Sequence, residues 1–218
     1  MQKIVKTGDG SHTIFAPGIN EHYHSIHGAV QESMHIFIKN GFDFCTANPV
    51  NILEIGFGTG LNALLTALRS IEVNKKVIYT TVEKYPLDEI TVKALNYNNI
   101  VGQNHQSLFG KIHSSPWNAD ARICNNFIIN KIQEDLTTIE LPGSYDLIYF
   151  DAFSPDKQPE MWTSKIFRMI SDVTVKNGTM VTYCVKGGVK RILLSSGFRV
   201  SLIPGPPGKR HILRAIKI

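Results

Sequence analysis

The spacing of apolar and polar positions along most of the chain predicts strands that alternate with helices. From residue 50 onward, short apolar runs bounded by turn residues are separated by longer segments with the apolar spacing of a helix. We expect strands at 50–55, 76–83, 123–133, 145–151, 178–185, 198–203 and 210–217, helices at 60–70, 87–97, 159–175 and 187–196, and an irregular stretch up to about 120. This order predicts an α/β fold with a mostly parallel sheet and helices on both of its faces.

The first 45 residues follow a different pattern. Two short β segments within 3–15 flank the dipeptide Asp9-Gly10, which favours a tight hairpin turn. Residues 28–40 have helical spacing, and Gly41 is placed to end that helix in the left-handed conformation. The apolar face of this helix consists of Val30, Met34, Phe37 and Ile38. We therefore expect an N-terminal flap of residues 1–45, packed on a larger domain of residues 46–218.

A glycine-rich turn joins the first strand of the larger domain to its first helix. Gly56, Gly58 and Gly60 let the backbone turn sharply, so that amide groups and a helix N-terminus can approach a ligand closely. Dinucleotide-binding loops carry their third glycine one position later, where this chain has Leu61. The loop instead resembles the S-adenosylmethionine loop of class I methyltransferases. A tight turn that binds no ligand is the alternative interpretation.

The C-terminal end of the predicted sheet supports the same resemblance. Residues 204–208 contain three prolines and two glycines, and this connection is too short for parallel pairing of the strands on either side. A parallel sheet that ends in an antiparallel hairpin resembles the seven-stranded, Rossmann-like class I methyltransferase fold. We expect that fold here.

Acidic residues stand at or near the carboxyl ends of four predicted strands, where a doubly wound sheet binds its ligand. Glu54 lies inside the first strand. Glu83 ends the second strand, where a carboxylate can accept hydrogen bonds from both ribose hydroxyls. Asp135 follows the third strand, where methyltransferases commonly hold the adenine amino group. Asp151 ends the fourth strand. Each alone is compatible with a surface carboxylate, but four at one edge indicate a site.

Asp151 begins the segment Asp-Ala-Phe-Ser-Pro, which takes the place of the Asp/Asn-Pro-Pro-aromatic loop of amino-methyltransferases. An alkylamine is mostly protonated at neutral pH, and methyl transfer needs its lone pair. A carboxylate beside the amine can orient it and accept its proton. We predict that Asp151 is catalytic and that Phe153 packs on a flat base. An N-cap and a core aromatic are the alternatives for these two residues, and Trp162 is either a stacking residue or a core anchor.

Charge is distributed unevenly along the chain, whose net charge is +5. Eight lysines and arginines and no acidic residue lie between Lys186 and Ile218. This basic tail indicates contact with a polyanion, because neutralising phosphates releases counterions. A solvated basic edge is the alternative.

The remaining features exclude several classes of protein. No signal-like or membrane-spanning apolar run is present, so we expect a cytoplasmic protein without a membrane partner. Cys45, Cys124 and Cys184 are too far apart to predict a disulfide framework. His22, His24 and His27 lie close together, but with no zinc-like spacing and no nearby cysteine we expect no metal.

Several blocks together resemble one family, the methyltransferase domain of MnmC, which methylates the 5-aminomethyl group of wobble uridine in certain tRNAs. The blocks are Tyr23-His-Ser with Gly28-Ala-x-x-Glu32-Ser, residues 54–62, residues 82–87, residues 150–162, and the tail from Gly188 through Gly197-Phe198 to Arg210. The resemblance implies S-adenosylmethionine as cofactor and tRNA as partner. Many family members also carry a flavin-dependent domain, for which 218 residues leave no room. We therefore expect this chain to act alone on an aminomethyl group made elsewhere. A monomer is compatible with the sequence.

The predicted contacts follow from the motifs and the resemblance together. Contacts to the cofactor are predicted for Glu54, Gly56, Phe57, Gly58, Gly60, Asn62, Glu83, Lys84, Asp135, Asp151 and Phe153. Contacts to the substrate are predicted for Tyr23, Glu32, Phe153, Lys209 and Arg210. The alternatives are a methyltransferase acting on a small-molecule amine and a non-catalytic module that binds nucleotides or RNA.

Overall fold

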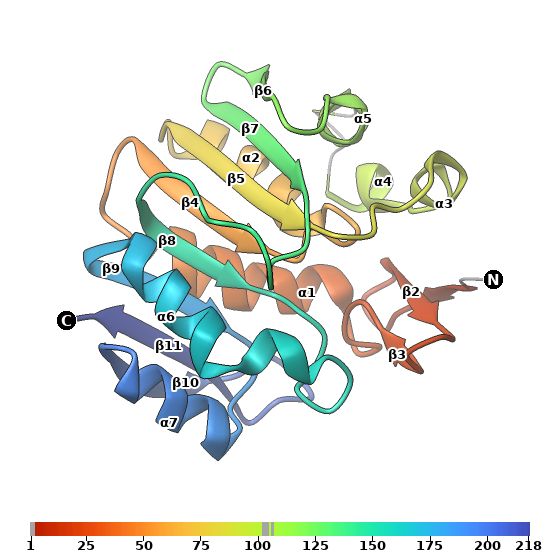
Figure 1. The fold of residues 1–218 in the computed structure, drawn as a ribbon. Helices are drawn as coiled ribbons and strands as arrows, with labels where there is room; N and C mark the ends of the chain where they lie inside the picture. The colour runs from red at the N-terminus through yellow and green to blue at the C-terminus, as the bar shows by residue number, and fades with distance from the viewer. Residues whose placement is uncertain (1–2, 102–104, 106) are drawn as a thin grey trace.

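The computed structural model describes residues 3–101, 105 and 107–218, and over these residues the chain forms one large and one small sheet (Figure 1). The large sheet has the strand order β10-β11-β9-β8-β4-β5-β7-β6. Its strands are β4 (Val50–Ile55), β5 (Val77–Glu83), β6 (Asp120–Cys124), β7 (Phe127–Gln133), β8 (Tyr145–Phe150), β9 (Thr174–Thr182), β10 (Phe198–Pro204) and β11 (His211–Lys217). The five central strands are parallel, whereas β6, β10 and β11 pair antiparallel to their neighbours. The α/β class, the parallel centre and the C-terminal hairpin are therefore confirmed.

Helices cover both faces of this sheet. One face carries α1 (Ala29–Ser33), which continues into the π-helix η1 (Met34–Phe42), together with α2 (Leu61–Glu72) and α5 (Ser107–Ser114). The other face carries the 3-10 turn η2 (Pro159–Trp162), α6 (Ser164–Val173) and α7 (Gly187–Ser195). Two short helices, α3 (Glu89–Lys93) and α4 (Tyr97–Val101), follow β5.

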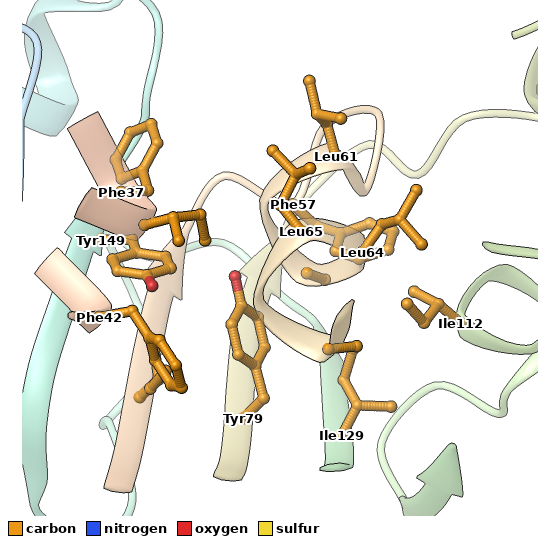
Figure 2. Packing of buried hydrophobic residues seen from close by; sticks show 14 of the residues in the cluster. Phe37, Phe42, Phe57, Leu61, Leu64, Leu65, Tyr79, Ile112, Ile129 and Tyr149 are labelled. Atoms are coloured by element: carbon orange, nitrogen blue, oxygen red, sulfur yellow. The ribbon is translucent and has the colours of Figure 1, made fainter. Parts of the chain in front are cut away.

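The alternating side chains of each strand divide the core between these two layers. Tyr149 of β8 packs with Phe37 on the α2 side, whereas the next residue, Phe150, packs with Trp162 and Phe167 on the α6 side. Figure 2 shows the first layer, in which Phe37, Phe42 and Tyr149 lie on one side of Tyr79 and the α2 leucines on the other. The core thus fixes α2, and with it the glycine loop, against the sheet.

A second, three-stranded antiparallel sheet lies near the carboxyl ends of the parallel strands (Figure 1). It consists of β1 (Lys3–Lys6), β2 (His12–Ala16) and β3 (Glu21–His22). β1 pairs with β2 across the predicted Asp9-Gly10 turn, where Gly10 has φ +87°. Ile14 of β2 is buried in the main core, so this sheet packs on the same core as the large sheet.

Gly41 does not end the first helix, so that prediction was wrong. The helix continues through Gly41 to Phe42, and Gly41 is not among the glycines of positive φ. A Cβ at this position would lie 3.0 Å from Tyr149 Cε1, so glycine serves here to let the helix approach the sheet. The predicted apolar face also needs correction, because Met34 is 40% exposed while Phe37 and Ile38 are buried.

The segment from 87 to 133 differs most from the prediction. The single expected helix at 87–97 is two short helices, and the stretch expected to be irregular contains α5. The single expected strand at 123–133 is a hairpin, in which Asn125 and Asn126 form a turn between β6 and β7. The sheet therefore has eight strands over the described residues instead of seven. The apolar run on both sides of the two asparagines concealed this turn.

No helix among the described residues is both long enough and apolar enough to span a lipid bilayer.

Candidate active site

A cavity of about 780 Å³ opens at the carboxyl ends of β4, β5, β7 and β8. Strand order reverses on either side of β4, and the crevice at such a reversal is the usual ligand site of a doubly wound sheet. One wall consists of the glycine loop and the segments that follow β5, β7 and β8. The rest of the lining comes from residues 21–27 and Glu32 near the N-terminus and from Gly208 and Lys209 in the C-terminal hairpin turn.

The glycine loop has the backbone that its sequence predicts. Gly56, Gly58 and Gly60 have φ of +88°, +50° and +72°. A Cβ on Gly56 would lie 2.8 Å from the carbonyl oxygen of Asp151, so glycine is needed where the ends of β4 and β8 meet. Gly56 and Gly58 line the cavity, whereas Gly60 lies under His113 at the start of α2.

Glu83, Lys84 and Asp135 line the same cavity, as their predicted role requires. The Glu83 carboxylate accepts hydrogen bonds from the backbone amides of Gly58 (3.0 Å) and Tyr85 (2.8 Å). Asp135 forms an ion pair with Lys84 (2.7 Å). This ion pair, assisted by hydrogen bonds from Thr137, lowers the pKa of Asp135 to about 2. Asp135 is therefore ionised at neutral pH and paired with Lys84.

Asp151 lies in the cavity at the end of β8, where its carboxylate Oδ2 accepts a hydrogen bond from Asn62 Nδ2 (2.8 Å). Burial raises the pKa of Asp151 to about 7, and the nearby Glu32 adds to this effect. The hydrogen bond from Asn62 and the charge of Lys209 act in the opposite direction. A carboxyl group that titrates near neutral pH is suited to exchange a proton with a substrate.

Glu54 lies behind the wall of the cavity and not in it. Its side chain is fully buried between Asn62, Tyr79 and Thr81, and burial raises its pKa to about 8. It is therefore neutral at pH 7. Of the described residues, those that line the cavity include neither Glu54 nor Asn62. Asn62 contacts Asp151 directly through its side-chain amide, and Glu54 lies behind it next to the same amide. A direct contact of Glu54 or Asn62 with a cofactor stays a prediction.

Aromatic residues form the side of the cavity next to Asp151. Tyr23 and Phe153 pack edge to face with ring centroids 5.0 Å apart, and Tyr23 also covers Gly58. Trp162 is buried in the core and donates a hydrogen bond from Nε1 to the carbonyl oxygen of Phe153 (2.7 Å). Trp162 thus anchors the segment that carries Phe153. Phe57 is also part of the cavity lining, and its ring packs against His113 and Trp117.

Glu32 and Lys209 meet in the cavity lining. Lys209 Nζ lies 2.5 Å from Glu32 Oε1, and the other carboxylate oxygen accepts a hydrogen bond from the backbone amide of Ser25 (2.9 Å). Arg210, the next residue, is exposed and outside the cavity lining. The predicted substrate residues Tyr23, Glu32, Phe153 and Lys209 are therefore brought together, while Arg210 is not.

Charge in the cavity is opposite to that of the chain as a whole. Its lining includes two lysines, Lys84 and Lys209, and a larger set of carboxylates: Glu21, Glu32, Glu83, Glu134, Asp135, Asp151 and Glu160. Such a lining attracts cations and repels phosphate. The sequence did not predict this, because the carboxylates come from segments far apart along the chain.

Two further residues of this site were missed. Tyr183 lines the cavity, donates a hydrogen bond to the carbonyl oxygen of Ala152 (2.9 Å) and lies with its ring 5.2 Å from Lys209 Nζ. Its position near the end of the predicted strand 178–185 was the signal available in the sequence. His24 Nε2 lies 2.7 Å from Thr59 Oγ1 and so ties the N-terminal segment to the glycine loop. Burial lowers the pKa of His24 to about 4, so its ring is neutral at pH 7.

Within the described residues, no cluster of three or more histidine, cysteine or acidic side chains has the geometry of a metal site.

The residues present fit S-adenosylmethionine. The cavity volume lies in the range of cofactor sites, glycine backbone is exposed in its wall, and Glu83 ends the strand beside it. The acidic lining suits a positively charged sulfonium. Glu83, Asp135 and the backbone of residues 56–58 would hold the group.

The fold and the site together define a nucleotide-cofactor enzyme of the methyltransferase class. Residues 98–218 match the family described as S-adenosyl-L-methionine-dependent methyltransferase, and the chain belongs to that family. The predictions of S-adenosylmethionine as cofactor and of an MnmC-type methyltransferase domain are confirmed.

Named relatives agree with this assignment. The tRNA 5-methylaminomethyl-2-thiouridine biosynthesis bifunctional protein MnmC of Leptospira interrogans is 31% identical over 88% of this chain and 32% of its own length. The protein of the same name from Burkholderia multivorans is 28% identical over 92% of this chain and 33% of its own length. The chain thus spans about a third of the curated relatives that it matches. The crystal structure of MnmC2 from Aquifex aeolicus has a TM-score of 0.79 at 26% identity and covers 99% of this chain and 69% of that chain.

Proposed function

We propose that this chain transfers the methyl group of S-adenosylmethionine to the 5-aminomethyl group of wobble (2-thio)uridine in tRNA, giving 5-methylaminomethyluridine. The observation that carries the proposal is Asp151, a carboxylate with a pKa near neutrality, held by Asn62 in an acidic cavity beside the glycine loop. The names of the curated relatives support the substrate.

When bound, S-adenosylmethionine supplies an electrophilic methyl group on a positively charged sulfur. Asp151 accepts a hydrogen bond from the substrate ammonium and then its proton, which exposes the nitrogen lone pair. Because its pKa is about 7, Asp151 is a stronger base than an ordinary aspartate. Asn62 holds one carboxylate oxygen in place, so the carboxylate presents its other oxygen in a fixed direction.

The charge pattern favours a nucleic-acid substrate whose backbone stays outside the cavity. An acidic lining admits a cationic aminomethyl group on a single base but repels phosphates. Tyr23 and Phe153 present aromatic surface on which a flat base can pack. The phosphates would then meet exposed cations of the basic tail, of which Arg210 lies next to the cavity residue Lys209.

The proposal is tested by methyl transfer from labelled S-adenosylmethionine to two matched tRNAs, one carrying 5-aminomethyl-2-thiouridine at the wobble position and one unmodified there. We expect label only in the first tRNA, at that nucleotide. Asp151→Asn should lower kcat by about a hundredfold or more while changing the Kd for the cofactor little, because the carboxylate acts on the amine. Equal labelling of the two tRNAs would reject the substrate.

The same experiment separates the alternatives. Labelling of the free aminomethyl nucleoside with a kcat/KM equal to that of the tRNA would indicate a small-molecule amine methyltransferase. Binding of tRNA with no transfer to any amine, in the presence of bound cofactor, would indicate a non-catalytic module.

A further inference from the structure

An amine of the protein itself, that of Lys209, lies in the lining of the acidic cavity. Lys209 Nζ lies 2.5 Å from Glu32 Oε1 and 5.2 Å from the centroid of the Tyr183 ring. A carboxylate and an aromatic face together are the surroundings that proteins use to hold an ammonium group. We propose that Glu32 and Tyr183 form the subsite for the ammonium of the substrate, and that Lys209 fills this subsite until the RNA backbone draws it away. This inference rests on the proposed function and adds how the substrate enters.

Glu32 is built to face a cation at this point. Its second oxygen is fixed by the backbone amide of Ser25 at 2.9 Å, so that Oε1 is directed at Lys209. Only 12% of the Glu32 side chain is exposed. A carboxylate so far removed from water needs a positive partner, and the loss of that partner is costly. Lys209 can therefore leave only when another cation takes its place.

Asp151 lies close to the ion pair of Glu32 and Lys209. Glu32 and Lys209 are both close enough to influence the pKa of Asp151, with opposite signs. All three side chains line one cavity, together with the ring of Tyr183, whose hydroxyl is held by the carbonyl oxygen of Ala152 next to Asp151. An ammonium bound to Glu32 in place of Lys209 would therefore lie near the proposed base.

The hairpin turn that carries Lys209 connects the cavity to the surface. Lys209 lines the cavity, and the adjacent Arg210 is exposed. The turn is held at both ends, by hydrogen bonds from the Gly205 amide to the Arg210 carbonyl (3.1 Å) and from the Lys209 amide to the Pro206 carbonyl (2.9 Å). Only the flexible Lys209 side chain needs to rotate outward. Outside the cavity it would join Arg210, where a phosphate can neutralise it.

The required exchange of partners explains why tRNA would be preferred to its isolated nucleoside. A nucleoside brings an ammonium for Glu32 but no phosphate for Lys209. A tRNA brings both, so that neither charge is left unpaired. The subsite therefore makes Lys209 a residue that determines specificity.

The experiment compares wild type with Lys209→Met on two substrates, the tRNA carrying 5-aminomethyl-2-thiouridine and the free 5-aminomethyl-2-thiouridine nucleoside. Methionine keeps much of the length of lysine without its charge. We expect a crossed response: KM for the nucleoside falls by about tenfold or more, whereas KM for the tRNA rises. Calorimetric binding of the nucleoside to the cofactor-free protein should tighten in parallel, which gives a readout that does not depend on turnover.

Two variants complete the test. Glu32→Gln should weaken binding of the nucleoside and of the tRNA alike, because it removes the acceptor of the ammonium. Lys93→Met, which breaks the exposed ion pair between Lys93 and Glu89 (2.6 Å), is the matched control and should change neither substrate's KM. Unchanged nucleoside binding in Lys209→Met, or equal changes for both substrates, would overturn the inference. Absence of transfer to the tRNA by wild type with bound cofactor would instead overturn the proposed function.

Discussion

Asn62 on α2 donates a hydrogen bond across 2.8 Å to the carboxylate of Asp151 at the end of β8. α2 begins directly after the glycine loop, so the element that shapes the cofactor wall also orients the proposed base. The other amide atom of Asn62, Oδ1, is buried and makes no hydrogen bond of normal geometry with any residue that the structure describes. It lies beside Glu54, whose neutral carboxyl group can donate a hydrogen bond to it.

Asn62→Leu removes the donor while keeping a side chain of similar size. Because the hydrogen bond lowers the pKa of Asp151, its loss should raise that pKa above about 7 and leave less carboxylate at neutral pH. We expect the acidic limb of the pH profile of kcat/KM to move to higher pH and the rate at pH 7 to fall by about tenfold. An acidic limb that stays in place would show that Asn62 does not control this ionisation.

Glu54→Gln tests whether the buried carboxyl group is neutral. Between the ordinary value of 4.5 and the raised value of about 8, the unfolded chain loses the Glu54 proton while the folded chain keeps it. Stability must therefore fall as pH rises through this window, by about 1.4 kcal/mol per pH unit from this residue. Glutamine has no proton to keep, so the variant should lose less stability than wild type between pH 5 and 8 in urea unfolding.

The same substitution at the exposed Glu140 is the control for that measurement. Parallel stability curves for wild type and Glu54→Gln over this pH range would mean that Glu54 is ionised in the folded protein.

A comparison of Gly56→Ala with Gly10→Ala separates the cost of the left-handed backbone from the effect of a neighbouring segment that lies close to the glycine. The two glycines have nearly the same φ, +88° and +87°, but a Cβ on Gly56 would lie 2.8 Å from the Asp151 carbonyl oxygen, and nothing lies within 4 Å of one on Gly10. Both variants should lose about 1–2 kcal/mol of stability from the left-handed conformation. Only Gly56→Ala should also weaken cofactor binding, by about tenfold or more in calorimetry. Equal cofactor affinity in the two variants would contradict a role for this contact.

Arg210→Ala tests the basic tail. If Arg210 contacts one phosphate, its removal should weaken tRNA binding and reduce the slope of log K against log salt by about 0.7 to 0.9. Arg122→Ala, at an exposed position on the edge strand β6, is the matched control and should leave the slope as in wild type. A slope unchanged by Arg210→Ala would indicate that Arg210 is a solvated surface residue that contacts no phosphate.

The sequence predicted those parts of the site that depend on local pattern and on strand order. Glycines at alternate positions identified the cofactor loop. The rule that parallel strands share a carboxyl edge predicted that Glu83, Asp135 and Asp151 lie close together, and all three line the cavity. The boundaries of β4, β5 and β8 follow from short apolar runs between turns.

Contacts between distant segments could not be predicted in this way. Lys209 and Glu32 are 177 positions apart, and their ion pair depends on how the C-terminal hairpin meets the N-terminal segment. Lysine in a basic tail favours a surface phosphate contact, but tertiary packing brings this one into an acidic cavity. Gly41 shows the same limit, because its close approach to Tyr149 outweighs the usual tendency of glycine to end a helix.

Two segments far apart in the sequence close the cavity together, since Glu32 comes from α1 and Lys209 from the turn before β11. During synthesis on the ribosome, the glycine loop and Asp151 are complete well before that turn emerges. A nascent chain would therefore hold an open, water-filled crevice, and the enclosure that methyl transfer requires would form only when the β10–β11 hairpin docks.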